Sequence, residues 1–476
     1  MPIEVMTPAA DHTHQALETE TARLLSTTTK TPPQMQEITP RWLLQLLPWV
    51  QVEGGVYRIN RRRQVLGGPG RVRIRENDGR VLVEPSDLRA ISVFQSADER
   101  LLEEVARLLV AEDRPAGAVL APNGQGIDQL YLVARGKLEL STAGSHGGKQ
   151  RLGLLTEGDH LGELALFQHI ADTPTIRTLT PCTLLTLERS SFEAALDRDP
   201  GFREDFLRAV QRRQDAQASS NPYGEVIIDL SSGHEGQPIL PTTFVDYDPE
   251  PVEHHLSAVQ TILSMHTRVG DLYSNPYDQL DEQVRLTVES IKERQEWEIL
   301  NNPRFGLLQV AVPQMRTPTQ TGPPTPDDLD DLISLVWRKP AFFLAHPRAI
   351  AAFGRECTRR GVPPATVLMG GFPFLTWRGI PLVPTDKLGV HFSPQGRLVS
   401  DILLVRVGEE AGGVVGLRHA GLKFEKTPSI SVTFNGVDTQ GLAHYLISAY
   451  FGVAVLTQNA LGVLEDVEVG NYHAYD

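Results

Sequence analysis

The chain has 476 residues, enough for two or three domains with cores of their own, and its 41% hydrophobic and 22% charged residues are ordinary for a globular protein. Its formal net charge of −14 counts against sequence-independent binding to nucleic acid, which needs a basic surface. Two distant cysteines exclude a disulfide framework, and the lack of a secretory signal or of an apolar run of roughly 20 residues favours a cytoplasmic protein.

The first 92 residues combine a polar tail with short strands. Residues 1–40 are rich in Thr and Pro and cannot fold alone, so they form either a disordered tail or an arm that orders against neighbouring subunits. The apolar run Arg41–Val50 predicts a helix that ends at Pro48. Three short strands follow in VYRINRR, RVRIREN and RVLVEP, separated by turns. The basic residues 61–63 favour a solvated or intersubunit strand face over a phosphate site.

From Val93 the pattern changes to a helix, a set of short strands and a second helix. Ser96 and Glu99 have the spacing of a capping box, and apolar residues at helical period follow them. The short strands and their glycine turns predict a compact roll or barrel. The second helix is expected after Ser191, with one apolar face. That face comprises Phe202, Phe206, Leu207 and Val210.

Beyond a polar linker at residues 214–224, strand and helix patterns return. EVIIDLSS predicts a strand, and a long helix follows. The apolar face of this helix comprises Leu280, Val284, Val288 and Ile291. Thr325 and Asp328 have capping-box spacing around Pro326, which predicts another helix start. The remaining residues alternate helix and strand patterns and contain no internal repeat.

The most specific motif lies between Gly117 and Arg177. Glycine turns, YLVARG, EGDHLGELAL and TPTIRT occur there in the order and spacing of a cyclic-nucleotide-binding domain, which residues 93–215 resemble. The resemblance implies that the Gly-Glu-Leu-Ala segment opens a short helix whose backbone N–H groups meet the cyclic phosphate. It also implies that Glu163 accepts a hydrogen bond from the ribose 2′-OH. The candidate ligand-binding residues are Gly162, Glu163, Leu164, Ala165, Thr173 and Thr175.

One position departs from the pattern of that family. Asp172 stands where an arginine normally binds the phosphate, and Pro174 stands where a small alanine is usual. A carboxylate repels a phosphodiester, and the charge-assisted contact is lost. Arg177 aligns with a basic position whose side chain usually points elsewhere. We therefore expect that no cofactor is required, that a cyclic nucleotide is only a candidate ligand, and that the roll serves packing or protein contacts.

The segments that flank the roll carry a second resemblance. Its most specific residues are SNPYDQLDEQVRLTVESIKERQEWEILNNPRFGLL, RKPAFFLAHPRAIAAFGRECTRRGV and MGGFPFLTWRGIPLVPTDKL. They resemble family 2 encapsulins, bacterial shell proteins with the tailed-phage capsid-protein fold, in the branch with an inserted cyclic-nucleotide-binding-like domain. The expected fold class is α+β, a capsid-like domain interrupted by a β-roll with flanking helices.

This resemblance divides the chain into seven parts. They are an extended N-terminal arm (1–40), the first part of the capsid-like domain with the first strands of an extended loop (41–92), the inserted domain (93–218), the return strands of the loop (219–250), a peripheral domain with a long helix (251–322), an axial domain (323–440) and a C-terminal part (441–476). The roll would sit in the extended loop, where an insertion lies outside the packed cores.

The resemblance also implies a function. The chain would be the subunit of a self-assembling icosahedral nanocompartment in the bacterial cytoplasm, with the roll on its outer face. The shell would enclose a cargo enzyme recruited through a disordered segment of that enzyme. Terpene cyclases and polyprenyl-processing enzymes are the cargo classes expected in this branch. The partners would be further copies of the chain and the cargo, with neither nucleic acid nor membrane.

No catalytic or metal site emerges from the sequence. His254 and His255 are neighbours on an expected helix and cannot share a face. Cys357 suits a core position on a helix better than a nucleophile. The acidic cluster suits a solvated helix start; it comprises Asp327, Asp328, Asp330 and Asp331. Two alternatives stay open. One is a cyclic-nucleotide-responsive transcription regulator, which the acidic charge and the missing recognition helix disfavour. The other is an enzyme gated by the roll.

Overall fold

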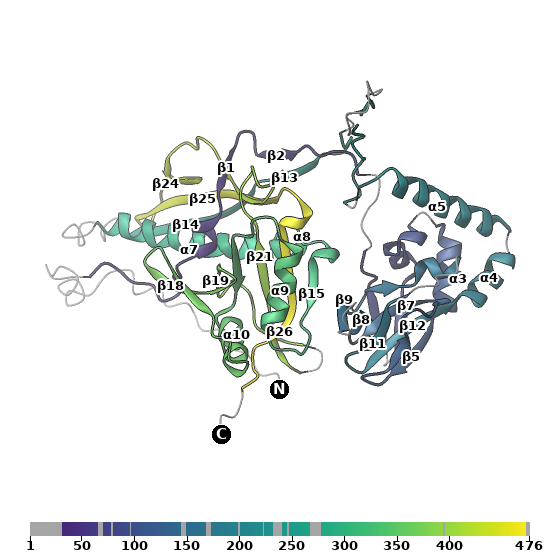
Figure 1. The fold of residues 1–476 in the computed structure, drawn as a ribbon. Helices are drawn as coiled ribbons and strands as arrows, with labels where there is room; N and C mark the ends of the chain where they lie inside the picture. The colour runs from purple at the N-terminus through teal and green to yellow at the C-terminus, as the bar shows by residue number, and fades with distance from the viewer. Residues whose placement is uncertain are drawn as a thin grey trace, which may run out of the picture. The chain divides into compact units, whose positions relative to one another are not determined.

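The computed structural model describes residues 31–64, 70–77, 80–95, 97–143, 149–167, 173–198, 200–221, 223–231, 240–244, 247–266, 278–393 and 396–472. The chain forms two compact units that alternate along the sequence. Figure 1 draws the ribbon with its helices and strands labelled. The first comprises residues up to Tyr57, His254–Gly306 and Val415–Ala454, and the second comprises Arg58–Glu253, Leu307–Val414 and the residues from Val455 on. Across the described ranges, no helix is long and apolar enough to cross a lipid bilayer.

The first unit is a six-stranded sheet with one long helix. Its strand order is β1-β22-β25-β24-β23, and β14 also pairs with β25. Helix α7 (Gln279–Asn301) contacts β14 and is capped by the Asp278 carboxylate, which accepts a backbone N–H of the first turn. The predicted apolar face is confirmed at Val284, Val288 and Ile291, which are buried. The strands are β1 (Trp49–Val52), β14 (Ser257–His266), β22 (Val414–His419), β23 (Glu425–Thr427), β24 (Ile430–Val437) and β25 (Leu442–Val455).

Carboxylates of α7 hold the short helix that precedes this sheet. Helix α2 (Trp42–Leu46) is the predicted helix, and it ends before the proline as expected. Its Leu43 donates the backbone N–H to Glu296 Oε1 at 3.0 Å, and Arg41 Nη1 lies 3.0 Å from Glu293 Oε1. Because both carboxylates are buried, these charge-assisted bonds are stronger than they would be in water and fasten α2 to α7.

The second unit contains an eight-stranded sheet against which α9 and α10 pack. The strand order is β15-β26-β21-β16-β19-β18-β17, and β20 pairs with β21. Leu332 of α9 and Phe353 of α10 are buried against strand residues such as Phe343 and Leu404. The strands are β15 (Arg316–Pro318), β16 (Phe342–Ala345), β17 (Ala365–Met369), β18 (Phe372–Trp377), β19 (Ile380–Pro384), β20 (His391–Phe392), β21 (Leu398–Val405) and β26 (Leu461–Glu468). The helices and turns are α8 (Leu307–Val310), η4 (Pro313–Met315), α9 (Pro326–Leu335), α10 (Pro347–Arg359) and η5 (Gln458–Ala460).

Helix α9 begins with the predicted capping box. Thr325 Oγ1 accepts the N–H of Asp328 at 3.2 Å, and Asp328 Oδ2 accepts the N–H of Thr325 at 2.8 Å. The expectation of a solvated acidic start is wrong at two positions. Asp328 is only 1% exposed, and Asp330 accepts the indole N–H of Trp377 at 2.6 Å. A partner from a distant strand satisfies Asp330, and such a contact leaves no local trace in the sequence.

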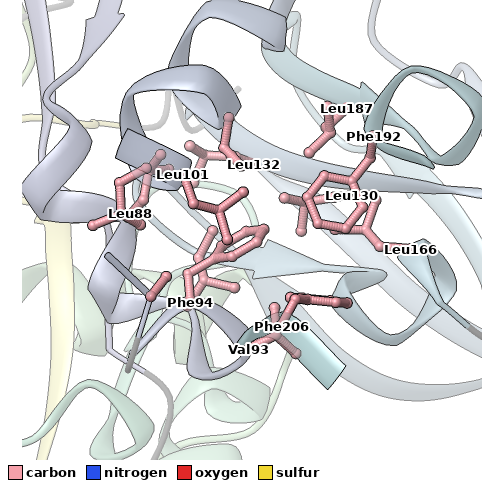
Figure 2. Packing of buried hydrophobic residues seen from close by; sticks show 14 of the residues in the cluster. Leu88, Val93, Phe94, Leu101, Leu130, Leu132, Leu166, Leu187, Phe192 and Phe206 are labelled. Atoms are coloured by element: carbon pink, nitrogen blue, oxygen red, sulfur yellow. The ribbon is translucent and has the colours of Figure 1, made fainter. Parts of the chain in front are cut away.

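The second unit also contains the predicted roll. It consists of two four-stranded sheets, ordered β10-β7-β12-β5 and β6-β11-β8-β9. Figure 2 shows its larger core, in which Phe94, Leu101, Leu130 and Phe192 are buried together. The strands are β5 (Val110–Arg114), β6 (Val119–Ala121), β7 (Gln129–Arg135), β8 (Leu138–Ala143), β9 (Lys149–Leu155), β10 (His160–Leu161), β11 (Thr175–Thr178) and β12 (Cys182–Glu188). A hairpin of β3 (Ile74–Asn77) and β4 (Arg80–Val83) precedes the turns η1 (Pro85–Ala90) and η2 (Ser92–Phe94).

The helices of the roll are α3 (Glu99–Leu108), α4 (Arg189–Arg198) and α5 (Pro200–Ala218). The predicted cap of α3 is wrong: the Asp98 carboxylate caps this helix, and Ser96 lies outside the described residues. The predicted face of α5 is wrong at Leu207, which is 55% exposed, whereas Phe206 and Val210 are buried. The side chain of Phe202 lies outside the described ones. In both helices the sequence pattern fits more than one neighbouring residue equally well, so it did not identify the capping residue of α3 or the limits of the buried face of α5.

Two antiparallel segments connect the roll to the rest of the chain. Strand β2 (Val56–Ile59) pairs with β13 (Val252–His255). Single antiparallel bridges continue this ladder toward the roll, Arg62 with Tyr247 and Gln64 with Glu225. Arg61 and Arg62 also donate to backbone carbonyls of the chain itself, whereas Arg63 is exposed, as expected for a solvated strand face. The outgoing and returning segments therefore lie next to each other.

Two sequence predictions fail along the returning segment. EVIIDLSS does not form a continuous strand, because among its described residues, 225–231, only the first two take part in bridges. Its apolar side chains stay exposed, Ile228 by 50% and Leu230 by 82%. The helix expected around His254 and His255 is a strand, β13, because its partner β2 supplies hydrogen bonds that a local pattern cannot anticipate.

A pH effect on stability is expected from Asp401, which lies at a bulge between β21 and β26. Burial raises its pKa to about 6, and the negative charges of Glu465 and Asp466 add to this rise. Two groups oppose the rise: His391, and the backbone N–H of Asp466, which donates to Asp401 Oδ1 at 3.1 Å. A carboxyl with a raised pKa binds its proton more tightly in the folded state, so folding loses stability as pH rises from about 4 to about 6. Relative to Asp401→Asn, the free energy of unfolding of the natural protein should fall by about 2 kcal/mol over this range. Denaturant titrations at several pH values measure it, and a constant difference between the two proteins would contradict the assignment.

Candidate ligand-binding site

The motif glycine stands where the backbone leaves no room for a side chain. Gly162 follows β10 and caps the single turn η3 (Glu163–Leu166) with a positive φ of 80°. A Cβ at this position would lie 2.4 Å from the carbonyl oxygen of Gln129 on β7. Glycine is required here both for its conformation and for the close approach of the two segments. The backbone turns at Gly162, so Glu163 begins η3 instead of continuing strand β10.

Glu163 is surrounded by three polar groups of the chain. Its Oε1 accepts from Ser92 Oγ at 3.2 Å and from Arg213 Nη2, also at 3.2 Å. Its Oε2 lies 3.5 Å from His160 Nε2. The carboxylate side chain is 17% exposed and that of Arg213 is 26% exposed, so water reaches the pair only in part. Burial lowers the pKa of His160, although the negative charge of Glu163 opposes this effect. Because its pKa is lowered, the imidazole is neutral at pH 7.

The other two residues of the motif helix serve its packing. Ala165 is fully buried among the roll's smaller core residues, and its N–H donates to the Gly162 carbonyl at 3.0 Å. The carbonyl of Leu164 accepts the N–H of Phe167 at 3.2 Å, which closes the turn. These bonds shape η3 itself.

The two candidate threonines hold a loop. Thr173 is 4% exposed; its hydroxyl donates to the Gln125 carbonyl, and its own carbonyl accepts the N–H of Gly124 at 2.9 Å. Thr175 Oγ1 accepts the N–H of Asn123 at 3.1 Å. The structure thus gathers both threonines around residues 122–125. Both hydroxyls already have partners.

The position that departs from the family pattern, Asp172, lies outside the described residues. Its effect on a phosphate therefore stays a prediction. Arg177, the first basic residue after Asp172, lies on β11 and is exposed. It is therefore placed where water solvates its charge.

Three residues around Glu163 were not found by sequence reasoning: Ser92, His160 and Arg213. Arg213 had a detectable signal, because it follows Phe206 by seven positions and Val210 by three, the spacing of one helix face. An arginine that continues a buried apolar face needs a carboxylate partner, and this would have been the sign of a contact with the roll.

The catalytic alternatives gain no support. Cys357 is fully buried, and burial raises the pKa of its thiol to about 11, so it stays protonated as a core residue. Ser264, His444 and Asp438 form a hydrogen-bonded chain, but on an exposed strand face where Asp438 already accepts two turn N–H groups. Within the described residues, no group of three His, Cys, Asp or Glu side chains is arranged to hold a metal ion.

Comparisons with known proteins agree with both parts of this architecture. Residues 213–471 match the family described as type 2A encapsulin shell protein SrpI-like, and residues 112–199 match the cyclic nucleotide-binding domain family. The type 2A encapsulin shell protein SrpI of Synechococcus elongatus is 48% identical over 303 residues, which cover 63% of this chain and 91% of that protein. A type 2A encapsulin shell protein of Mycolicibacterium paratuberculosis is 50% identical over 67% of this chain and 98% of its own length. The cryoEM structure of the holo-SrpI encapsulin complex from S. elongatus matches with a TM-score of 0.55 and 33% identity, over 97% of this chain and 99% of that chain.

Two properties of Gly162 oppose its replacement, the positive φ and the lack of space for a Cβ, and a glycine that has only the first property separates their effects. Gly124 has φ +75°, but a Cβ there would meet nothing within 4 Å. Gly124→Ala should lower the stability of the roll by about 1 kcal/mol, the cost of the left-handed conformation alone. Gly162→Ala should cost several times more, because its Cβ meets a backbone oxygen. Hydrogen exchange of the roll's strand amides measures both losses, and equal losses would show that the close approach to Gln129 is unimportant.

Proposed function

The chain belongs to the type 2A encapsulin shell proteins, with an added cyclic-nucleotide-binding-type domain, and on this premise we propose that it builds a closed icosahedral shell around a cargo enzyme. The observation that carries the proposal is the match of residues 213–471 to the shell family, together with two shell relatives that are covered over more than nine tenths of their length. Encapsulin shell proteins self-assemble into large oligomers that enclose cargo.

The surface of the single chain supports assembly with further copies. The returning segment exposes Leu230 by 82% and Phe244 by 86%. In the second unit, the edge strand β17 is exposed at every residue except the last, and the β17–β18 hairpin exposes Leu368 by 75% and Phe372 by 58%. Large apolar side chains and an unpaired strand edge are costly in water, and proteins cover them with other chains. We infer that neighbouring subunits cover both segments.

The cargo and the place of the roll are finer parts of the proposal. Terpene cyclases and polyprenyl-processing enzymes are the cargo classes that the family resemblance suggests, recruited through a disordered segment of the cargo. The roll would decorate the outer face of the shell, where an inserted domain disturbs no subunit contact. We propose that it requires no cofactor, because the hydroxyls of Thr173 and Thr175 are committed to a loop and Glu163 already has a cationic partner. The match to shell proteins supports a shell subunit better than a transcription regulator.

Assembly is tested first on the protein purified alone. Gel filtration should place it in the megadalton range, and electron microscopy should show uniform hollow particles, as expected for a closed symmetric homo-oligomer. A monomer of 52.6 kDa or a dimer would remove the shell proposal and redirect attention to ligand and DNA binding by the roll.

The roll should be dispensable for assembly. Gln64 and Glu225 are antiparallel bridge partners, so their Cα atoms lie about 5 Å apart and a short Gly/Ser linker can replace residues 65–224. The shortened chain should form closed particles with the symmetry of those of the full chain, because the remaining strands and helices keep their cores. Particle images of both proteins, prepared alike, make the comparison. A folded but unassembled shortened chain would show that the roll takes part in subunit contacts.

A further inference from the structure

The dipeptide Asn-Gly occurs twice in the chain, and the structure places the two copies in different surroundings. Asn123 and Gly124 lie between strands β6 and β7 of the roll, whereas Asn435 and Gly436 lie on strand β24 of the first unit. Asn-Gly is the dipeptide in which an asparagine amide reacts most readily with its own backbone, because glycine has no Cβ to shield the following nitrogen. The local contacts of each copy therefore decide whether that reaction occurs.

The reaction begins when the backbone nitrogen that follows the asparagine attacks the side-chain carbonyl carbon. This nitrogen gives its proton to water or hydroxide, its bond to Cγ forms, and the bond from Cγ to Nδ2 breaks, so that ammonia leaves and a cyclic succinimide remains. Water then adds to one of the two ring carbonyls and opens the ring to aspartate or isoaspartate. In sum, asparagine and water give a carboxylic acid and ammonia, with no change of oxidation state. The reaction needs a side-chain amide that can rotate and a following nitrogen that is free to attack.

Three hydrogen bonds hold the copy in the roll. The N–H of Gly124, which carries the attacking nitrogen, donates to the carbonyl of Thr173 at 2.9 Å. The side-chain Oδ1 of Asn123 accepts from Thr142 Oγ1 at 3.2 Å, and its backbone N–H donates to Thr175 Oγ1 at 3.1 Å. Attack would have to break the bond to Thr173 and turn the Asn123 amide away from Thr142. Because each broken bond raises the barrier, this copy is protected although it is exposed.

The copy on strand β24 lacks these restraints. Asn435 is the extra residue of a β-bulge, because the pairing with β25 passes from Phe434 directly to Gly436. Its side chain is exposed and, among the residues that the structure describes, has no hydrogen-bond partner. Gly436 has a φ of +111°, and a Cβ there would meet nothing within 4 Å, so space is open beside the asparagine. The amide of Asn435 can therefore rotate toward the nitrogen of Gly436.

The bulge also lies where strand β24 is paired on one side. In the described part of the sheet, β23 pairs with β24 at Ile430 and Ser431 and not beyond, so residues 434–437 form an outer edge. Local opening of such an edge costs less free energy than opening of a central strand. Water and hydroxide therefore reach the backbone of Gly436 without unfolding of the first unit.

We propose that Asn435 is a site of spontaneous deamidation in this protein and that Asn123 is not. The reaction creates a carboxylate three residues before Asp438, which already accepts two N–H groups in the turn between β24 and β25. The isoaspartate product also adds a methylene group to the main chain, which disturbs the pairing of the residues beyond it. Both changes loosen the β24–β25 hairpin. This reactivity goes beyond the proposed function and does not depend on it.

Peptide mapping by mass spectrometry on the folded full-length protein tests the proposal. After incubation in mildly alkaline buffer made with heavy-oxygen water, the peptide that contains Asn435 should carry a labelled carboxyl group and separate into aspartate and isoaspartate forms. Conversion at Asn435 should be about tenfold faster than at Asn123, the ratio expected when one backbone hydrogen bond must first be broken at Asn123. Raising the pH from about 7 to about 8 should speed conversion at Asn435 about tenfold, because the attacking nitrogen must lose a proton.

Two controls separate the effect of the structure from that of the dipeptide. In denaturant the two asparagines should convert at similar rates, because each is then followed by glycine and has no fixed partner. Asn435→Gln should abolish conversion at this position, since the longer side chain would have to close a larger ring, and should leave conversion at Asn123 unchanged. Equal rates at the two asparagines in the folded protein, or a faster rate at Asn123, would overturn the proposal.

The consequence for the hairpin is measured on the same samples. Hydrogen exchange of the β24 amides should become faster in step with conversion at Asn435, while exchange of the roll's strand amides stays constant. Unchanged exchange of β24 in fully converted protein would refute the loosening of the hairpin.

Discussion

The antiparallel pairing of the outgoing and returning segments is the constraint on which the rest of the structure depends. Because β2 pairs with β13, and Gln64 with Glu225, the chain departs from and returns to almost the same point. A whole domain can then occupy the interval without moving the strands on either side of it. The roll has its own core around Phe94 and Phe192, and the eight-stranded sheet has another around Phe343 and Phe353, so neither depends on the other for burial of its apolar residues.

Retention of a binding motif does not by itself make a binding site. Gly162 is explained by the close approach to Gln129, and Ala165 by its burial, so both are needed for the fold of the roll whether or not a ligand binds. Glu163 is the residue with the strongest claim to recognise a ribose, and its carboxylate is satisfied by Arg213. Packing and internal electrostatics are therefore enough to account for these three residues in the fold of the roll.

The single chain buries its hydrophobic cores fully, but parts of its surface expose large apolar side chains. Carboxylates from α7 hold α2 in place, and a capping box starts α9, so each unit is closed by its own contacts. Several of the most exposed apolar side chains lie on the returning segment and on the β17–β18 hairpin. Side chains such as Phe244 and Leu368 contribute nothing to the fold of one subunit, which is the expected property of surfaces whose partner is another copy of the chain.

The sequence alone determined those features whose signal lies within a few residues: the capping box of Thr325 and Asp328, the apolar face of α7, the end of α2 before Pro48, and the roll with its glycine motif. The family resemblance, carried by such local runs, also identified the shell fold and the encapsulin family. Only the tertiary structure decided that His254 and His255 lie on a strand, that Asp328 is buried, and that Arg213 binds Glu163. Each of these depends on a partner far away in the sequence, and hydrogen bonds or ion pairs between distant segments leave no periodic pattern in either one. The candidate ligand-binding residues of the roll stay a prediction, and the partner of Glu163 could not be read from a local pattern because Arg213 lies 50 residues further along the chain.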